Sequence, residues 1–163
     1  MPTWQQHLLD RVGRQLAQQP LGAPLGADPR RTRIHLAILR EPYLSLILNR
    51  EKTIESRFSK NYRPPFERAS PGDLILLKAA AGPIRGAATV KRAWFFRRTH
   101  TWDHIRTRYG RSMCAQDDAF WAERARTSYA TLLELDHVVA FPDVNCEKRD
   151  RRGWVILTEP TLW

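Results

Sequence analysis

Cysteine is scarce in this sequence, because Cys114 and Cys146 are the only two among 163 residues. Neither has a second cysteine or a histidine at zinc-site spacing, so neither a disulfide framework nor structural zinc is indicated. His100 and His104 lie one helical turn apart, but no third ligand accompanies them. We therefore expect two buried free thiols, no metal and no cofactor.

Long apolar segments are missing as well. No stretch approaches the roughly 20 apolar residues that cross a bilayer. The segment Met1–Asp10 lacks the basic and then apolar pattern of a secretory signal. These absences predict a cytoplasmic protein without membrane contact.

Acidic residues are few relative to basic ones: 17 against 27, which gives a formal net charge of +10. Residues 34–98 carry 13 basic and 5 acidic side chains, whereas residues 99–163 are close to neutral. A local excess of arginine attracts phosphate backbones and can pair with them bidentately. The imbalance predicts a polyanionic partner, and a charged surface that serves solubility alone is the alternative.

The chain divides into a short N-terminal part and one domain. Trp4, Leu8, Val12 and Leu16 recur every four residues, which predicts an amphipathic helix ending near Pro20. Residues 20–33 are rich in proline and glycine and predict a linker. Residues 1–33 would therefore precede a single domain at 34–163. The helix needs a partner for its apolar side, and a homodimer through it is one prediction.

Within the domain, short apolar runs alternate with turn signals. They predict strands at 34–39, 52–58, 74–79, 84–96, 132–141 and 154–158, with a bend at Gly86. Helices are expected at 42–50, 101–110 and 116–129, and loops at 61–70 and 142–153. This order predicts an α+β fold, built on a small closed β-barrel of mixed or antiparallel strands with flanking helices, rather than a βαβ sheet.

The most informative stretch follows the helix at 42–50. In an extended strand, Thr53, Glu55 and Arg57 project from one face, and mostly apolar side chains project from the other. The carboxylate and the guanidinium can pair with each other. They can also present an acceptor and a forked donor to a base edge or a phosphate.

These residues and their context, from IHLAILREPYLSLILNREKTIESRF to ASPGDLILLKAAAGPIRGAATVKRAWFF, resemble the ASCH domain family. The family hallmark is Gly-x-Lys-x-x-Glu-x-Arg after the first helix, with a Gly-Asp turn before the next strand. Lys52, Glu55 and Arg57 match the hallmark, Gly72-Asp73 matches the turn, and Arg50 stands where the family has glycine. The resemblance covers about residues 34–158 and leaves the first 33 residues unexplained.

The resemblance implies a PUA-like barrel that binds RNA or modified nucleotides in a basic cleft between the helix at 42–50 and the motif strand. Lys52 and Arg57 would neutralise phosphate, and Glu55 would accept a hydrogen bond from an exocyclic amine. The implied nucleic-acid-binding residues are Arg50, Lys52, Thr53, Glu55, Arg57, Lys60 and Arg63.

A hydrolase is the alternative that the resemblance leaves open. Some small ASCH relatives remove the acetyl group from N4-acetylcytidine with a lysine, a threonine three residues later and a glutamate from the helical region, and ribonuclease activity has also been suggested. Lys52 matches the lysine, but Glu55 occupies the threonine position, and Thr53 is only a substitute hydroxyl. If the protein is an enzyme, the implied catalytic residues are Lys52, Glu55 and Glu123.

Two further segments have both a functional and a structural interpretation. Trp94, Phe95 and Phe96, followed by Arg97 and Arg98, could form a stacking platform, but we expect Trp94 and Phe96 to be core residues. The basic run at 148–152 is expected to be a solvated loop, with phosphate contact as the alternative.

Overall fold

The computed structural model describes residues 3–18, 32–148 and 150–160 of the chain, which form four helices and six strands. The helices are α1 (Thr3–Ala17), α2 (Tyr43–Leu48), α3 (Asp103–Tyr109) and α4 (Asp118–Arg124). The strands are β1 (Ile34–Leu39), β2 (Ile54–Ser59), β3 (Leu74–Ala79), β4 (Ile84–Arg97), β5 (Tyr129–Val144) and β6 (Trp154–Thr158). The predicted α+β class is confirmed.

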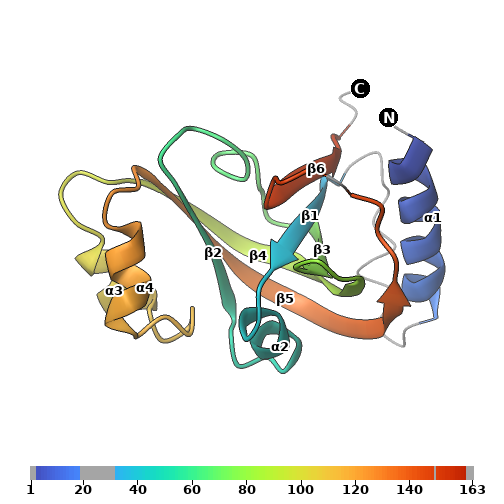
Figure 1. Ribbon diagram of the computed structural model, residues 1–163, viewed down its shortest axis with the longest axis horizontal. Coiled ribbons are helices and arrows are strands. Elements are labelled where there is room, and N and C mark those ends of the chain that lie inside the picture. Colours follow the sequence, from blue (N-terminus) through green and yellow to red (C-terminus); the bar gives the residue numbers. More distant parts are fainter. Residues whose placement is uncertain (1–2, 19–31, 149, 161–163) are drawn as a thin grey trace.

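The six strands form one mixed sheet in the order β2-β5-β4-β3-β1-β6. β1 and β3 are parallel, and the other four neighbouring pairs are antiparallel. The sheet curves into the half-barrel seen in Figure 1, with α1 at one end of the molecule and α3 and α4 at the other. Among the described residues the ladder is open, with β2 and β6 as its edges. Strand pairing therefore gives a half-barrel and not the closed barrel that the sequence predicted.

The strands β1, β3 and β6 have the predicted bounds. Nearly every residue of β1 and β3 is buried. A strand covered on both faces appears in the sequence as a continuous apolar run rather than as an alternation. This explains why runs such as Ile34–Leu39 were sufficient to locate them.

The two long strands bend the sheet. β4 and β5 pair along most of their length, and their register shifts at three places. Bulges of this kind increase the local twist and bend the strand. The predicted bend at Gly86 coincides with the first shift, and a Cβ there would lie 2.4 Å from the Val139 carbonyl oxygen. Only glycine allows this close approach of the two strands.

Two predicted boundaries were wrong around β5. The helix expected at 116–129 ends at Arg124, and the loop expected at 142–153 begins only after Val144. The cause is tertiary pairing, because Tyr129 lies opposite both Ser59 on β2 and Arg97 on β4. Sheet hydrogen bonds to two neighbours outweigh the local helical pattern there.

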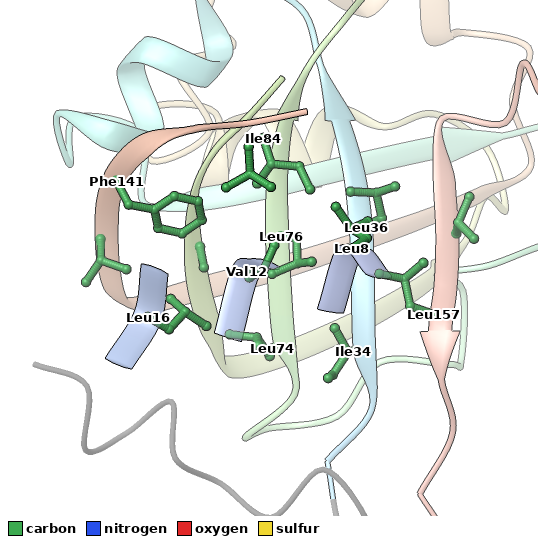
Figure 2. Packing of buried hydrophobic residues seen from close by; sticks show 14 residues of the cluster. Leu8, Val12, Leu16, Ile34, Leu36, Leu74, Leu76, Ile84, Phe141 and Leu157 are labelled. Carbon is green, nitrogen blue, oxygen red and sulfur yellow. The ribbon is translucent and has the colours of Figure 1, made fainter. Parts of the chain in front are cut away.

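The predicted N-terminal helix is confirmed as α1, and its apolar side is buried by the chain's own sheet. Figure 2 shows Leu8, Val12 and Leu16 facing side chains of β1, β3, β5 and β6. Leu8 is fully buried and Val12 is 2% exposed. These residues are already covered, so the predicted homodimer would have to use another side of α1. The predicted helix end at Pro20 and most of the predicted linker lie outside the described residues.

A separate aromatic cluster joins α3 and α4 to the sheet. Trp102, Phe120 and Trp121 are buried there, and Trp94 and Phe96 pack partly buried against them. Trp94 and Phe96 thus belong to the edge of the aromatic core, half-buried rather than fully buried. The two thiols are free but half-buried, rather than buried as expected.

No group of three or more metal-ligating side chains occurs in the part of the chain that the structure describes. No helix in that part is long and apolar enough to cross a membrane.

Arg50 ends α2 in a left-handed conformation, with φ of 64°. The Arg50 amide donates to the Ile47 carbonyl (2.9 Å) and the Glu51 amide to the Leu46 carbonyl (2.9 Å). This pair of bonds is a Schellman motif, whose left-handed position is usually glycine. The motif gives a physical reason for a glycine at this point of the resembling family, and Arg50 adopts the same conformation at an energetic cost.

We predict that Arg50→Gly is more stable than Arg50→Ala by about 1 kcal/mol, because glycine adopts a positive φ without steric penalty. Both variants lose the bond from Arg50 Nη2 to the Val138 carbonyl (3.1 Å), so their difference isolates the backbone. Urea denaturation of the two variants measures this difference in the free energy of unfolding. Equal midpoints would contradict the prediction.

Candidate functional site

A cleft of about 790 Å³ lies where the sheet edges approach each other. Its walls come from β2, the C-terminal ends of β1 and β3, Tyr43 of α2, the helix α4 and the segment before β6. Eight of its described lining residues are Arg or Lys, and four are Asp or Glu. The cleft thus adjoins the predicted helix and motif strand, and two further walls come from segments far along the chain.

Lys52 lines the cleft and is 3% exposed. Its Nζ donates to the carbonyl oxygens of Ile54 and Met113, both at 2.8 Å, and lies 5.4 Å from the centre of the Tyr43 ring. Burial lowers the pKa of Lys52, while the Glu55 carboxylate acts in the opposite direction. An ammonium group has three donors, so one remains for a ligand.

Glu55 is buried beside Lys52 and is 5% exposed. Its Oε1 accepts a hydrogen bond from the Ser56 amide (2.8 Å) and lies 3.7 Å from Arg57 Nε. Its Oε2 is buried, and no atom of the described chain donates to it. Burying an acceptor without a donor costs about 1–3 kcal/mol, so this oxygen is a candidate ligand contact.

Arg57 connects the two edges of the sheet. From β2, its Nη2 donates to the Ile38 carbonyl on β1 (2.8 Å) and its Nη1 to the Gly153 carbonyl just before β6 (3.1 Å). The guanidinium lies 5.1 Å from the centre of the Trp154 ring. Two of its donor groups are therefore used by the fold, a role that the sequence did not indicate.

Arg124 of α4 is a cleft residue that sequence reasoning missed. Its guanidinium lies 3.5 Å from the centre of the Phe120 ring, and its Nη1 donates to the Phe120 carbonyl (2.9 Å). Burial lowers its pKa, while nearby Tyr43, Glu123 and Glu55 act to raise it. An aromatic residue four positions before an arginine on a helix is the signal that could have revealed this stacked cation.

The segment before β6 contributes to the cleft three charged side chains that contact one another, Lys148, Asp150 and Arg152. The Asp150 carboxylate accepts from Arg152 Nη2 (3.0 Å) and lies 2.8 Å from Lys148 Nζ. Bonds from Arg152 and then Lys148 hold the Asp150 pKa well below its usual range. Arg151 is exposed at the same place. The described residues of the run expected to be a solvated loop, Lys148, Asp150, Arg151 and Arg152, therefore line the cleft.

The fold has clear counterparts among solved structures. The crystal structure of ASCH from Zymomonas mobilis superposes with a TM-score of 0.62 at 15% identity, over 81% of this chain and 90% of that one. The chain has an ASCH-like fold. Two point variants of that protein, tyrosine to phenylalanine and serine to alanine, give TM-scores of 0.63 at 16% identity, over 77% and 81% of this chain and 91% and 92% of theirs. No family model and no curated protein matches the sequence.

Within this ASCH-like fold, the three hallmark matches Lys52, Glu55 and Arg57 line one cleft. Glu123 lines it as well, with a side chain that is 76% exposed and 3.5 Å from Arg124 Nη1. All members of the expected catalytic set thus lie in the same cleft. Their proposed chemical roles stay predictions.

The other expected binding residues do not line the cleft. Arg50 is at the end of α2 and bonds to β5. Thr53 is exposed, and its backbone accepts from the Leu135 amide (2.9 Å). Lys60 and Arg63 are exposed in the loop that follows β2. A nucleic-acid role for these four residues also stays a prediction.

We predict that Lys52 loses its proton below the ordinary lysine pKa of about 10.4, because burial disfavours the ammonium form. NMR titration of 13Cε-labelled lysine measures the Lys52 midpoint. Glu55→Gln should lower the Lys52 pKa further, since the carboxylate stabilises the cation. A Lys52 titration midpoint at or above the ordinary lysine value would contradict the prediction.

The same shift has a consequence for stability. The unfolded chain, with a lysine pKa of about 10.4, binds more protons than the folded chain between the lowered pKa and that value. The contribution of Lys52 to the free energy of unfolding therefore rises with pH in this window. Comparing the pH dependence of unfolding in wild type and Lys52→Met measures the contribution.

Proposed function

We propose that the protein binds single-stranded RNA, with one nucleobase in the cleft and the adjoining phosphates at its rim. The unpartnered Oε2 of Glu55 is the observation that carries this proposal. A buried carboxylate oxygen accepts well from an exocyclic amine such as cytosine N4, and repels phosphate. The ligand atom that meets Glu55 is therefore a donor on a base.

How exposed each cation is suggests which of them contact the phosphates of the RNA. Lys52 and Arg57 already donate to backbone carbonyls, so their charges act on the ligand mainly from inside the cleft wall. Arg40 and Arg151 are exposed lining residues whose guanidinium groups can reach a phosphate in solvent. Arginine forms bidentate bonds to phosphate oxygens, which suits such a rim.

The aromatic lining is suited to a base as well. Tyr43 and Phe120 both line the cleft, and their rings meet edge to face with centres 6.4 Å apart. Unstacked bases of single-stranded RNA are commonly held against aromatic rings and arginine planes. Arg124, stacked on Phe120, adds such a plane beside the same rings.

The binding test uses labelled single-stranded RNA and matched DNA of about a dozen nucleotides, at about 50 and 200 mM salt. In fluorescence anisotropy, Arg40→Ala/Arg151→Ala should reduce the slope of log K against log salt by about 1.4, or about 0.7 for each lost phosphate contact. Arg85→Ala/Arg108→Ala removes the same charge outside the cleft and should leave the slope closer to that of wild type.

Glu55→Gln tests the base contact separately. It should change the preference among homopolymers more than the salt slope, because it alters a contact with a base rather than with phosphate. An absence of RNA binding at low salt would overturn the proposal. Equal losses in the two arginine pairs would show binding to the general positive charge rather than to the cleft.

A hydrolase is the second candidate, supported by the juxtaposition of Lys52 and Glu55. An amine with a lowered pKa beside a carboxylate is suited to proton transfer. Glu123 adds a second carboxylate at the cleft. N4-acetylated cytidine and RNA are the substrates to which the sequence resemblance points.

For this candidate we predict turnover of N4-acetylcytidine that Lys52→Met abolishes and Lys91→Met preserves. Lys91→Met removes the same charge, but from a side chain that is 53% exposed and lies outside the cleft. If Lys52 acts as a base, the rate rises with pH through its lowered pKa, because only the neutral amine accepts a proton. Product is measured by chromatography, with circular dichroism as the folding control. Unchanged turnover in Lys52→Met would exclude this mechanism.

A further inference from the structure

An exposed tyrosine, backed by two further aromatic rings and a cation, lies beyond the end of β2. Tyr62 is a large hydrophobic residue, and 53% of it is exposed to solvent. Its ring meets those of Phe66 and Tyr129 edge to face, with centres 5.5 and 5.9 Å apart. We call Tyr62, Phe66, Tyr129 and Arg97 the Tyr62 patch.

The patch is rigidly built. Phe66 is 2% exposed and packs against Tyr129 and Phe95, with ring centres 5.0 and 5.6 Å away. The Tyr62 hydroxyl donates to Glu67 Oε2 (2.9 Å). An exposed ring fixed by its neighbours loses little conformational entropy when a flat ligand stacks on it.

Arg97 supplies an oriented cation. Its guanidinium carbon lies 5.9, 5.4 and 5.3 Å from the ring centres of Tyr62, Phe66 and Tyr129. The side chain is still 59% exposed, and Nη2 lies 3.6 Å from Glu67 Oε1. Three aromatic contacts thus hold the group while much of it faces solvent.

The charge around the patch favours a polyanion. Lys60 and Arg63 are exposed on either side of Tyr62 in the sequence, and with Arg97 they outnumber Glu67. Exposed aromatic rings beside cations bind single-stranded nucleic acid, because every base has a face that can stack. A partner protein would gain little from a single exposed ring whose surroundings are mainly cationic.

The patch continues from the cleft. Phe58 on β2 lines the cleft, and Tyr62 follows four residues later, at most about 14 Å along the chain. Ser59 pairs with Tyr129, so the end of β2 leads directly into the patch. One bound strand can therefore contact both places.

We propose that the Tyr62 patch is a second RNA contact, where a base outside the cleft stacks on Tyr62 and Arg97 binds the adjoining phosphate. This inference rests on the proposed RNA binding in the cleft and extends it along the strand. It assigns Lys60 and Arg63 to this patch instead of to the cleft.

The test compares Tyr62→Ala with Tyr62→Phe, which keeps the ring and loses only the hydroxyl. For RNA of about a dozen nucleotides, Tyr62→Ala should weaken binding about 5- to 150-fold, the range found when a stacking aromatic residue is removed. Tyr62→Phe should bind within about twofold of wild type, since stacking needs the ring alone. RNA of two nucleotides, which fills the cleft alone, should bind Tyr62→Ala as tightly as wild type.

A 2-aminopurine base placed at successive positions reports stacking directly. Its fluorescence should be quenched at one position outside the cleft by wild type and Tyr62→Phe, and not by Tyr62→Ala. Arg97→Gln changes an exposed side chain and provides a second test if Tyr62→Ala is poorly folded. It should weaken binding of the longer RNA and leave the shorter RNA unaffected.

The outcomes separate the two proposals. If wild type binds neither RNA, both the cleft proposal and this inference fail. If RNA binds and Arg40→Ala/Arg151→Ala weakens it, but Tyr62→Ala and Arg97→Gln do not, the Tyr62 patch is overturned and the cleft stands. Quenching that survives in Tyr62→Ala would also overturn the patch.

Discussion

The guanidinium of Arg57 is the constraint on which the site depends. The sheet is open in the described residues, and an open edge leaves backbone groups without partners. Arg57 donates from β2 to carbonyls of Ile38 and Gly153 on the opposite side of the opening. A side chain thus connects edges that strand pairing leaves apart. The cleft is the space beside this connection, so its width depends on one residue of the motif.

Arg57 is supported in turn by a buried polar chain. Its guanidinium lies over Trp154, whose Nε1 donates to His35 Nδ1 (2.9 Å), and His35 Nε2 lies 2.8 Å from Asp73 Oδ2. Because Nδ1 accepts, the His35 proton is on Nε2 and is donated to Asp73. Asp73 also accepts from the Ser70 amide (3.0 Å). The Gly-Asp turn therefore starts β3 and also fixes the aromatic ring beneath Arg57.

Local sequence was sufficient for the parts of the structure that local forces determine. β1, β3 and β6 followed from apolar runs between turns, and Lys52, Glu55 and Arg57 line one cleft as the family resemblance implied. The path of the chain beyond β2 is set by tertiary packing, which turns Lys60 away from the cleft. Tyr43 and Arg124 come from helices far apart in the sequence. Only the folded sheet brings them together, so no spacing could reveal the pair.

The burial of Lys52 and Glu55 separates a functional from a structural interpretation of the cleft. Burying an ammonium group and a carboxylate near each other is weak evidence for stability, because desolvation offsets much of their attraction. A buried carboxylate oxygen with a structural role is expected to have a donor, and Asp73 Oδ2 has two, the His35 ring and the Ser70 amide. Glu55 instead has one oxygen bound by the Ser56 amide and one that the described chain leaves without a donor. Retaining that cost beside a large cleft is consistent with a ligand that supplies the missing hydrogen bond.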